Sequence, residues 1–350
     1  MIKTKFKIDD ETLEPVKSFC YLGFDIVPSG VVTRAMNTLY DKAKKAPHPL
    51  MSAIAKFDLP AKLAIQLFHT YISPIILYGV ENWSILSDLD IERFEIQSPF
   101  NKTEKASVDI AHRKLPKFTL GVSRTCPNLA VYGETGETPL SLKGYRLMLN
   151  YWKRVSSLPD KSLAKKALIE NANLRTNWIM TIEKLLGCFK LTQVPQKIFK
   201  SKSKTFIHSY FVHNWKNKLL SEDIFRLTVY KTINDDFILP RHLGLPYQFR
   251  KVISRTRCSN HPLAIEKGRH TNPITPRQER FCKLCNDQVV EDEDHFLLKC
   301  STYTHLRDHY QINHDNLPDF LNMEDQSLLA KYLLSAYELR ERLLFGRVRD

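Results

Sequence analysis

The sequence predicts a mainly α-helical protein that begins with a β-hairpin and ends in a small zinc-binding module with closing helices. Apolar residues recur at three- and four-residue steps over most of the chain, which is the period of an amphipathic helix. Strict alternation occurs near the N-terminus, and cysteines at metal-ligand spacing occur near the C-terminus. The 350 residues, 43% of them hydrophobic, can bury sizeable cores, and we expect two or three units.

Residues 1–32 are predicted to form the β-hairpin. KTKFKI alternates polar and apolar residues, DDET supplies a turn, and SFCYLGFDIV is apolar and aromatic enough for a strand. An isolated two-stranded hairpin is at best marginally stable in water. We therefore expect that this segment cannot be stable alone.

Two helical regions follow. Residues 33–97 are predicted to form a small helical bundle, because their apolar periodic stretches are each begun or ended by proline. A polar stretch from residue 98 marks a boundary, and 98–249 is predicted to be a further helical connector domain. Its clearest helix, within PLSLKGYRLMLNYWKRV, has an apolar stripe made of Leu142, Tyr145, Leu149, Trp152 and Val155.

Residues 250–281 are predicted to be a basic linker. The chain has a net charge of +14, and half of that excess lies between residues 250 and 283. The nine cationic residues there are Arg250, Lys251, Arg255, Arg257, Lys267, Arg269, Arg277, Arg280 and Lys283. A phosphate backbone is the natural partner of such a basic strip, whereas the alternative is a solvated linker whose charges keep it soluble.

The segment 282–350 is predicted to hold one structural Zn²⁺. Its ligand pattern is Cys282-x2-Cys285-x9-His295-x4-Cys300. Two cysteines separated by two residues fit a tight turn whose thiolates converge on one ion. His295 and Cys300 are expected about one helical turn apart. The four side chains would then complete a tetrahedron. The alternative is that these cysteines bind no metal. If His295 is not the fourth ligand, His305 or His309 is expected in its place.

Several classes of protein are not expected. The chain lacks an apolar run of membrane-spanning length, and MIKTKFKIDD lacks the apolar core of a signal peptide, so we expect neither a membrane protein nor a secreted one. Four further cysteines are scattered singly, which indicates reduced thiols in the nucleus or cytoplasm. They are Cys20, Cys126, Cys188 and Cys258.

Four stretches together resemble a known family. They are FCYLGFDI (19–26), PIILYGVENW (74–83), the segment 119–154 that includes CPNLAVYGETGETPL, and 265–307, which runs from IEKGRHTN to HFLLKCSTYTHLR. In this order they resemble the C-terminal part of the reverse transcriptase polyprotein of non-LTR (LINE-type) retrotransposons. The matches span most of the chain, and four of them at consistent spacing are far more specific than any one.

The resemblance implies roles for the predicted segments. Residues 1–32 would be the end of the palm and the primer grip, with Phe19, Tyr21, Leu22 and Gly23 supporting the 3′ end of the primer. Residues 33–97 would be the thumb, which follows the template and primer duplex. The C-terminal region would be a zinc knuckle that helps to capture nucleic acid. The expected partners are RNA and RNA/DNA duplex, with no small-molecule substrate.

The resemblance also implies that this chain is not itself a polymerase, because the sequence starts too late to contain the palm aspartates that hold two Mg²⁺ ions. The pairs Asp9-Asp10 and Asp235-Asp236 are interpreted as turn residues, since they lack a partner motif.

A nuclease that follows the zinc knuckle in some members is not expected. Pro318-Asp319 and Glu338-Leu339-Arg340 only loosely match its motif, in segments that read as helices.

Two functions remain open from the sequence. The first is a nucleic-acid-binding C-terminal fragment of a retrotransposon RNA-directed DNA polymerase, in which the basic strip and the zinc module act together as one clamp. The second is a zinc-stabilised protein-interaction scaffold derived from a decayed retroelement. Salt-sensitive binding of RNA would favour the first, and its absence at low salt would favour the second.

Overall fold

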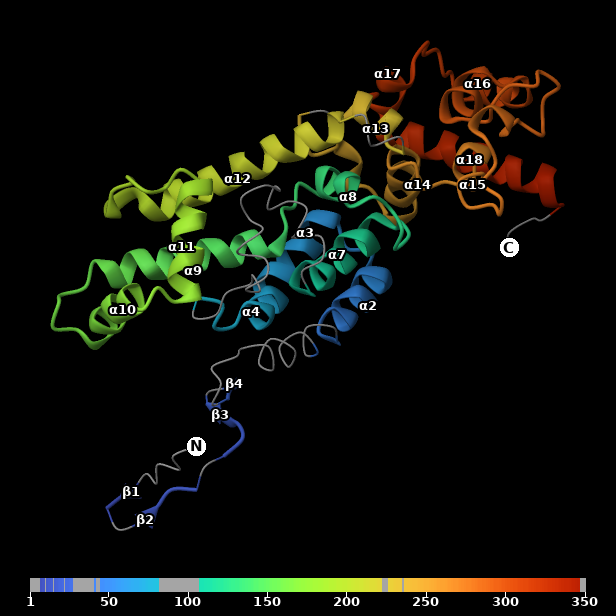
Figure 1. Ribbon diagram of the computed structural model, residues 1–350. Coiled ribbons are helices and arrows are strands. Elements are labelled where there is room, and N and C mark those ends of the chain that lie inside the picture. Colours follow the sequence, from blue (N-terminus) through green and yellow to red (C-terminus); the bar gives the residue numbers. More distant parts are fainter. Residues whose placement is uncertain are drawn as a thin grey trace.

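The computed structural model describes residues 7–9, 11–14, 16–21, 23–27, 41, 45–81, 107–221, 226–234 and 236–346. Within them the protein is mainly α-helical, with short strands only near the N-terminus (Figure 1). This agrees with the predicted fold class. The predicted helix that begins at residue 33 and the end of the 74–83 motif lie largely outside the described residues.

The N-terminal strands form two separate two-stranded antiparallel sheets. Strand β1 (Lys7–Ile8) pairs with β2 (Glu11–Thr12), and β3 (Phe19–Tyr21) pairs with β4 (Phe24–Ile26). Gly23 turns the second hairpin with a φ of +81°, a value that glycine adopts without strain. Figure 1 shows both hairpins apart from the helices. β-Structure near the N-terminus is therefore confirmed, but the predicted hairpin is corrected: SFCYLGFDIV, expected as one strand, turns at Gly23 and pairs with itself.

The first helical layer is built around prolines. Its elements are α2 (Pro47–Phe57), α3 (Ala61–Leu67), the π-helical turn η1 (Phe68–Ile72) and α4 (Ser73–Ile76). Proline stands at the start of α2, α3 and α4, where it is tolerated because the first N–H groups of a helix have no partner inside it. The layer packs against α7 (Ser107–Leu120) through buried residues such as Ile54 and Phe68.

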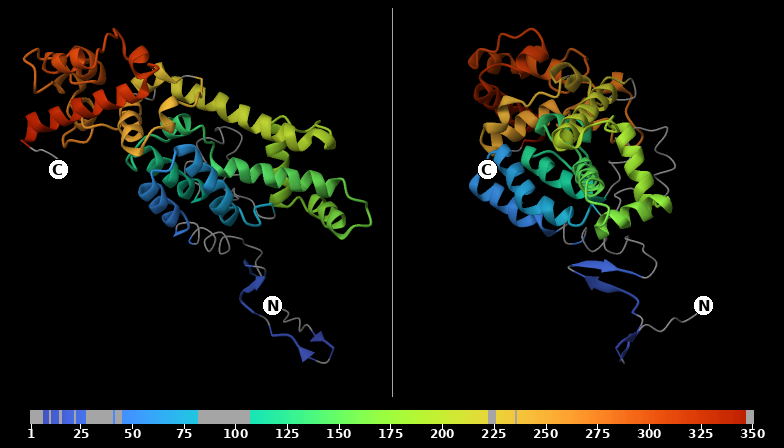
Figure 2. Two further views of the ribbon diagram at one scale, coloured as in Figure 1. Left: turned by 180° about the vertical axis from the view of Figure 1, so that it is seen from behind. Right: turned by 90° about the vertical axis from the view of Figure 1, so that its left-hand side faces the viewer.

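The middle of the chain forms a layer of longer helices. They are α8 (Asn128–Thr135), α9 (Leu140–Ser156), α10 (Leu163–Asn173), α11 (Asn177–Cys188) and α12 (Gln196–Leu220). Helices α9 and α12 lie side by side in both Figures 1 and 2. Trp215 is fully buried and donates from Nε1 to the carbonyl of Leu129 at 2.8 Å. It also packs so closely on Gly133 that a Cβ there would lie 2.6 Å from the indole.

The C-terminal region is made of shorter elements and one long closing helix. They are α13 (Thr228–Ile233), η3 (Arg241–Gly244), α14 (Tyr247–Arg257), α15 (Ala264–Lys267), η4 (Arg277–Glu279), η5 (His295–Lys299), η6 (Ser301–Tyr303), α16 (Thr304–His309), α17 (Leu317–Leu321) and α18 (Gln326–Phe345). Asp325 caps α18 by accepting from the N–H groups of Ser327 and Leu328. Figure 2 shows this region at the opposite end of the molecule from α10.

The segment 250–281 is not a linker, which corrects that prediction. Helix α14 packs against α7 on one side and α18 on the other, so the first part of the segment is a central element of the fold. Its amphipathic face is buried through Val252 and Ile253. A linker was predicted because charged residues outnumber apolar residues in this segment, although residues of both kinds are buried here.

The described residues do not separate into independent cores. Their buried apolar side chains form one connected cluster that extends from Ile54 to Ala336. Helix α7 joins the layers, because it contacts α2 and α3 as well as α8 and α9. The boundary predicted near residue 250 therefore does not interrupt this packing, and the one predicted near residue 98 lies outside the described residues.

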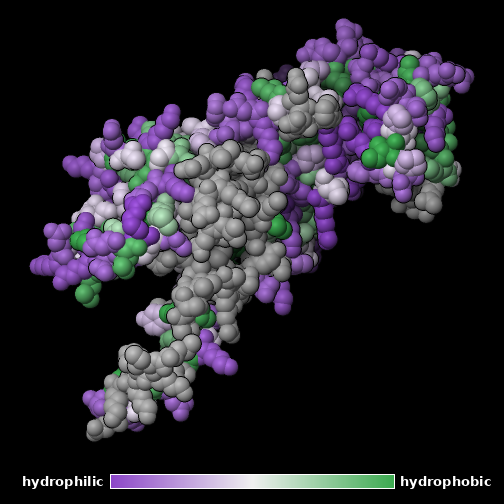
Figure 3. Space-filling view, in the orientation of Figure 1, coloured by the Kyte–Doolittle hydropathy of each residue, from purple (hydrophilic) through white to green (hydrophobic). Residues whose placement is uncertain are grey.

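The surface in Figure 3 is mostly hydrophilic over the described C-terminal helices. Among the described residues, helices of membrane-spanning length and hydropathy are absent. Asp319 and Glu338, which loosely match a nuclease motif, lie on helices α17 and α18. That nuclease would need its carboxylates on strands, so the structure agrees with the interpretation of these segments as closing helices.

Candidate functional site

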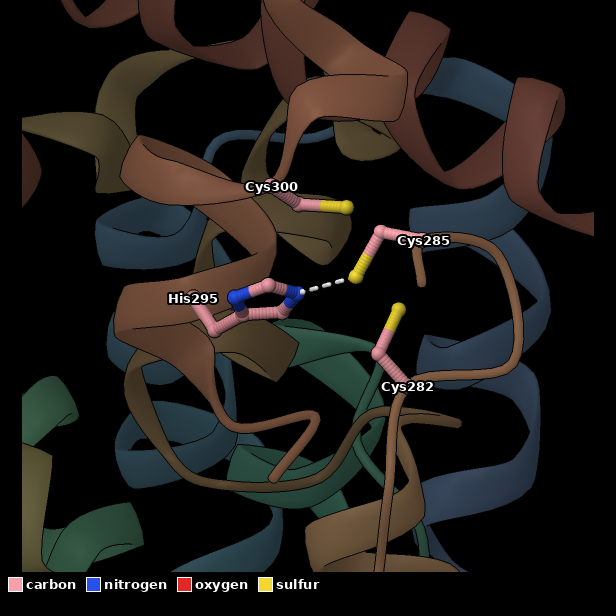
Figure 4. A group of neighbouring side chains, drawn as sticks. All are labelled: Cys282, Cys285, His295 and Cys300. Atoms are coloured by element: carbon pink, nitrogen blue, oxygen red, sulfur yellow. Dashed lines mark hydrogen bonds between the residues drawn. The ribbon is translucent and has the colours of Figure 1, made fainter. Parts of the chain in front are cut away.

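The four predicted metal ligands converge at one point. The ligand atoms of Cys282, Cys285, His295 and Cys300 all lie within 4.8 Å of one another. Figure 4 shows the three sulfur atoms and the imidazole ring facing a common centre. Cys282, His295 and Cys300 are buried, and Cys285 is half-buried. This donor set fits a closed tetrahedral site of the kind that holds structural zinc.

One distance in the cluster can be compared with zinc geometry. Zn–S bonds of about 2.3 Å and Zn–N bonds of about 2.0 Å at the tetrahedral angle separate the two atoms by roughly 3.5 Å. Cys285 Sγ and His295 Nε2 are 3.3 Å apart. This pair of ligand atoms would therefore have to move apart by only a few tenths of an ångström to bind one zinc ion.

The loop of Cys282 and Cys285 is closed by backbone pairing. Phe281 and Val290 form an isolated antiparallel bridge, and the N–H of Cys282 donates to the carbonyl of Val289 at 2.8 Å. Burial raises the pKa of the Cys282 thiol, while hydrogen bonds from the backbone N–H groups of Leu284 and Cys285 lower it. Donors aimed at a sulfur favour its thiolate, which is the form that binds a metal.

Cys285 and Cys300 have similar surroundings. Burial raises the pKa of each thiol, while a backbone N–H opposes this effect, that of Asp287 at Cys285 and that of Thr302 at Cys300. The Thr302 hydroxyl donates to the carbonyl of Leu284 at 3.0 Å, which ties the two halves of the site together.

His295 and Cys300 are brought together by a π-helical turn. They are five residues apart, and an α-helix would place them about 140° apart around its axis. In η5 the N–H of Cys300 instead donates to the carbonyl of His295 at 2.7 Å, an i→i+5 bond. His295 and Cys300 are therefore one helical turn apart, as predicted, but the turn is π-helical instead of α-helical.

Aromatic packing supports this turn from behind. Phe296 is 1% exposed and meets Tyr303 edge to face, with ring centroids 4.8 Å apart. Tyr332, from α18, donates its hydroxyl to the carbonyl of Leu297 at 2.5 Å. The closing helix thus holds the backbone that carries His295.

A buried ion pair fixes the loop to the same helix. Glu291 accepts two hydrogen bonds from Arg340, at 2.6 and 2.7 Å, and both side chains are almost fully buried. Glu291 also accepts from the N–H of Ala264 at 2.7 Å, where α15 begins. A second carboxylate, Glu293, pairs with His261 at 2.9 Å. Two of the four consecutive acidic residues at 291–294 are therefore buried and paired.

Three residues of the basic strip are buried, which corrects their assignment to phosphate contacts. Arg250 is fully buried and donates to the carbonyls of Thr119, Leu245 and Leu59. Arg257 is paired with Glu134 through Nε, 3.1 Å from both carboxylate oxygens. Arg280 donates to the carbonyls of Ile265 and Thr275. The N–H groups of these three arginines therefore connect separate segments of the fold.

The other six residues of the strip retain access to solvent. Lys251 and Arg255 are half-buried beside Gly121, and Arg255 Nε donates to the Gly121 carbonyl at 2.7 Å. Lys267, Arg277 and Lys283 are exposed, and Arg269 is half-buried. Only this part of the strip can face a phosphate.

A cationic pocket that the sequence did not indicate lies on the helical body. Its volume is about 1110 Å³, and its lining draws on α2, α7, the loop after α7, the end of α12 and the segment after α15. Seven cationic residues line it: Arg113, Lys114, Lys117, Arg124, Lys218, Arg226 and Arg269. Among the described lining residues, neither aspartate nor glutamate occurs. Arg269 belongs to both the strip and the pocket.

A buried carboxylate positions one wall of this pocket. Glu266, on α15, accepts from Arg226 at 3.2 Å and from Arg269 at 2.9 Å. Lys117 donates to the carbonyls of Arg124 and Cys126, which fixes the opposite loop. Because Glu291 binds the start of α15 and Glu266 lies near its end, the candidate zinc loop supports the pocket wall through one short helix.

Of the predicted primer-grip residues, Phe19, Tyr21 and Gly23 lie on the second hairpin, and Leu22 lies outside the described residues. Phe19 is 58% exposed and Tyr21 is 59% exposed, and alternation places them on one face of β3. Gly23 occupies the turn.

Of the two aspartate pairs, Asp9 lies in the turn between β1 and β2, and Asp236 is paired with Lys216 at 2.6 Å. Asp10 and Asp235 lie outside the described residues.

Comparison with known proteins adds no further constraint. The sequence matches no protein-family model, no curated protein and no solved structure at a significant level. The geometry of the Cys3His cluster and the cationic pocket is therefore the basis on which function can be argued.

Proposed function

We propose that the chain binds RNA and RNA/DNA duplex, as a region equivalent to the C-terminal part of a non-LTR retrotransposon reverse transcriptase. The observation that carries this proposal is the cationic pocket, whose described lining includes seven lysines and arginines and neither aspartate nor glutamate, although Glu266, outside the lining, pairs with Arg226 and Arg269. Such a concentration of one sign of charge attracts a polyanion. Phe118 adds an aromatic ring to the lining, and cations beside aromatic rings are a common platform for single strands.

The proposed clamp combines the pocket, the exposed part of the basic strip and the zinc module. Arg269 contributes to both cationic surfaces, and Glu266 holds it in place. Zinc bound by Cys282, Cys285, His295 and Cys300 would order the loop that carries Lys283 and Glu291. A surface ordered beforehand loses less entropy when it meets its partner.

The segments take the following roles in this proposal. Residues 1–32 present Phe19 and Tyr21 as a primer-grip surface, the helices α2 to α4 act as a thumb, and α7 to α13 form the connector. We further propose that the chain does not polymerise DNA, because of its two aspartate pairs Asp9 lies in a turn and Asp236 pairs with Lys216, and neither belongs to a cluster of metal ligands among the described residues.

The proposal is tested by salt-dependent binding. Fluorescence anisotropy of a labelled single-stranded RNA, and of an RNA/DNA hybrid, is measured at several salt concentrations. The pocket variant is Lys114→Ala with Arg124→Ala, because both side chains are exposed. If both meet phosphate in single-stranded RNA, the slope of log affinity against log salt becomes shallower by about 1.4.

The matched control is Lys161→Ala with Lys166→Ala. These lysines are exposed near and on α10, far along the chain from the pocket, and the net charge changes by the same amount. We expect the control to keep the original slope. Equal slopes for all three proteins, or no binding even at low salt, would refute the proposal and favour the protein-interaction scaffold.

A further inference from the structure

A second group of metal-ligand side chains lies in the helical body, away from the cysteines. His69 comes from η1, His112 from α7, and Glu137 from the loop between α8 and α9. Their ligand atoms lie within 4.8 Å of one another, and this is one of two such groups found among the described residues. The sequence did not suggest it, because its members are far apart along the chain.

Both imidazoles point the same nitrogen at one carboxylate oxygen. Glu137 Oε2 is 2.7 Å from His69 Nε2 and 3.3 Å from His112 Nε2. Metal–ligand bonds of about 2.0 Å at the tetrahedral angle separate two ligand atoms by roughly 3.3 Å. The pair with His112 already has this spacing. His69 would have to retreat by roughly half an ångström, and it is the most exposed member, at 31%.

The burial of His112 needs an explanation. Its side chain is 1% exposed, and neither ring nitrogen has a hydrogen-bond partner of good geometry among the described residues. A buried polar atom without a partner costs free energy comparable to that of a lost hydrogen bond. A cation bound at Nε2 would satisfy this nitrogen, whereas the weak 3.3 Å contact with Glu137 does not.

A carboxylate and a lysine complete the surroundings of the two rings. Glu137 is largely buried, with its side chain 15% exposed, and its Oε2 is the atom that both imidazoles approach. Lys143 opposes a cation here, because it lies close enough to Glu137 for their charges to interact, and it donates to Ser73 at 2.9 Å.

We propose that His69, His112 and Glu137 form a second metal site, which takes a divalent first-row transition ion such as Zn²⁺ through two imidazoles and one carboxylate. This donor set leaves a fourth position open, unlike the Cys3His cluster. The inference goes beyond nucleic-acid binding and does not depend on it. Because Lys143 opposes the ion and thiolates are absent, this site binds metal more weakly than the cysteine site.

The experiment measures metal stoichiometry on the full chain. Protein is dialysed to equilibrium against saturating Zn²⁺, and bound metal is the difference between the zinc inside and outside the membrane, measured by inductively coupled plasma mass spectrometry. We expect two ions per chain in the unaltered protein and one in His69→Ala. Cys282→Ser with Cys285→Ser should also hold one. The control His213→Ala removes an exposed histidine from α12, outside both clusters, and should leave two.

Cobalt gives a second readout. Co²⁺ bound by cysteine shows thiolate-to-metal charge-transfer absorption, which a site of imidazoles and carboxylate lacks. In the double cysteine variant we expect visible cobalt absorption without the charge-transfer band, and its loss when His69→Ala is added. One ion per chain at saturating Zn²⁺ in the unaltered protein, or an unchanged count in His69→Ala, would overturn the proposal.

Discussion

The two candidate metal clusters differ in how the chain brings their ligands together. The Cys3His cluster lies within residues 282–300, so its ligands are at most 18 positions apart along the chain, and local N–H groups surround its sulfur atoms. The second cluster joins residues up to 68 positions apart, and helix packing places them. Metal binding would therefore order the loop that carries the ligands of the first site, whereas the ligands of the second site are in place without the metal.

This difference teaches where metal binding should be coupled to folding. Ligands in a loop are scattered when the loop is disordered, so the binding free energy becomes folding free energy. Ligands on packed helices remain near one another without the ion. The following predictions separate these two situations, starting with the largest expected effect.

Removal of zinc should unfold the loop of the Cys3His cluster. Structural zinc contributes roughly 10 to 16 kcal/mol in small zinc-binding peptides at neutral pH. We expect a strong chelator, or Cys282→Ser with Cys285→Ser, to abolish amide protection over residues 281–300 while α9 and α12 stay protected. Hydrogen exchange measured by mass spectrometry resolves these segments.

Unchanged protection of the loop after complete removal of metal would show that packing alone holds it. Packing would then place the ligands of both clusters. The control is the variant His69→Ala, in which residues 281–300 should keep their amide protection.

The ion pair between Glu291 and Arg340 should be the main link from the loop to the closing helix. Breaking a buried pair by removing one partner costs about 3 to 5 kcal/mol, because the other charge is left uncompensated. We expect Glu291→Ala to lower the free energy of unfolding by about this amount in urea denaturation. The exposed pair of Arg175 and Glu183 is the control, and Glu183→Ala should cost less than about 1 kcal/mol.

A histidine that is not a metal ligand offers a further contrast. His242 is fully buried, and burial lowers its pKa well below 6.5, with Arg257 and Arg250 acting in the same direction. It contacts Ser254 at 2.9 Å and Glu134 at 3.3 Å. In the folded protein it stays neutral as the pH falls below 6.5, while the unfolded chain takes up a proton.

Stability should therefore fall with pH below about 6.5, by up to about 1.4 kcal/mol per pH unit for this one proton. We expect His242→Gln to remove that part of the slope between pH 6.5 and 5.5 in urea denaturation. An identical slope in the variant would indicate that His242 is protonated in the folded state.

The smallest effect is expected at the second cluster when metal is absent. His69→Ala removes one hydrogen bond to Glu137 at a half-exposed position, so we expect a loss of about 1 kcal/mol in metal-free buffer. Thermal unfolding with and without Zn²⁺ measures this. A loss of several kcal/mol without metal would mean that the histidine holds the helices together, and the contrast between the clusters would weaken.

The sequence predicted the parts of this molecule that depend on local spacing. The helical periodicity, the small N-terminal sheets and the convergence of Cys282, Cys285, His295 and Cys300 all depend on residues close together along the chain. Zinc occupancy and the retrotransposon resemblance stay predictions.

What depends on distant contacts was not predicted. Arg250 looked like a surface charge, yet it is buried by the carbonyls of Leu59 and Thr119, more than 100 residues away. The pocket joins segments that carry Lys114, Lys218 and Arg269, which no local pattern connects. A weak signal existed, because Arg250 and Arg257 share one face of α14 with buried Ser254.

The π-helical turn η5 has a consequence for insertions and deletions. Loss of a single residue from Phe296–Lys299 would allow an ordinary α-helical turn and would keep all four ligand residues in the sequence. His295 and Cys300 would nevertheless no longer be joined by the i→i+5 bond that now sets their spacing. A related chain with the same cysteines and histidine but a shorter gap between the last two should therefore be expected to bind its metal differently, if at all.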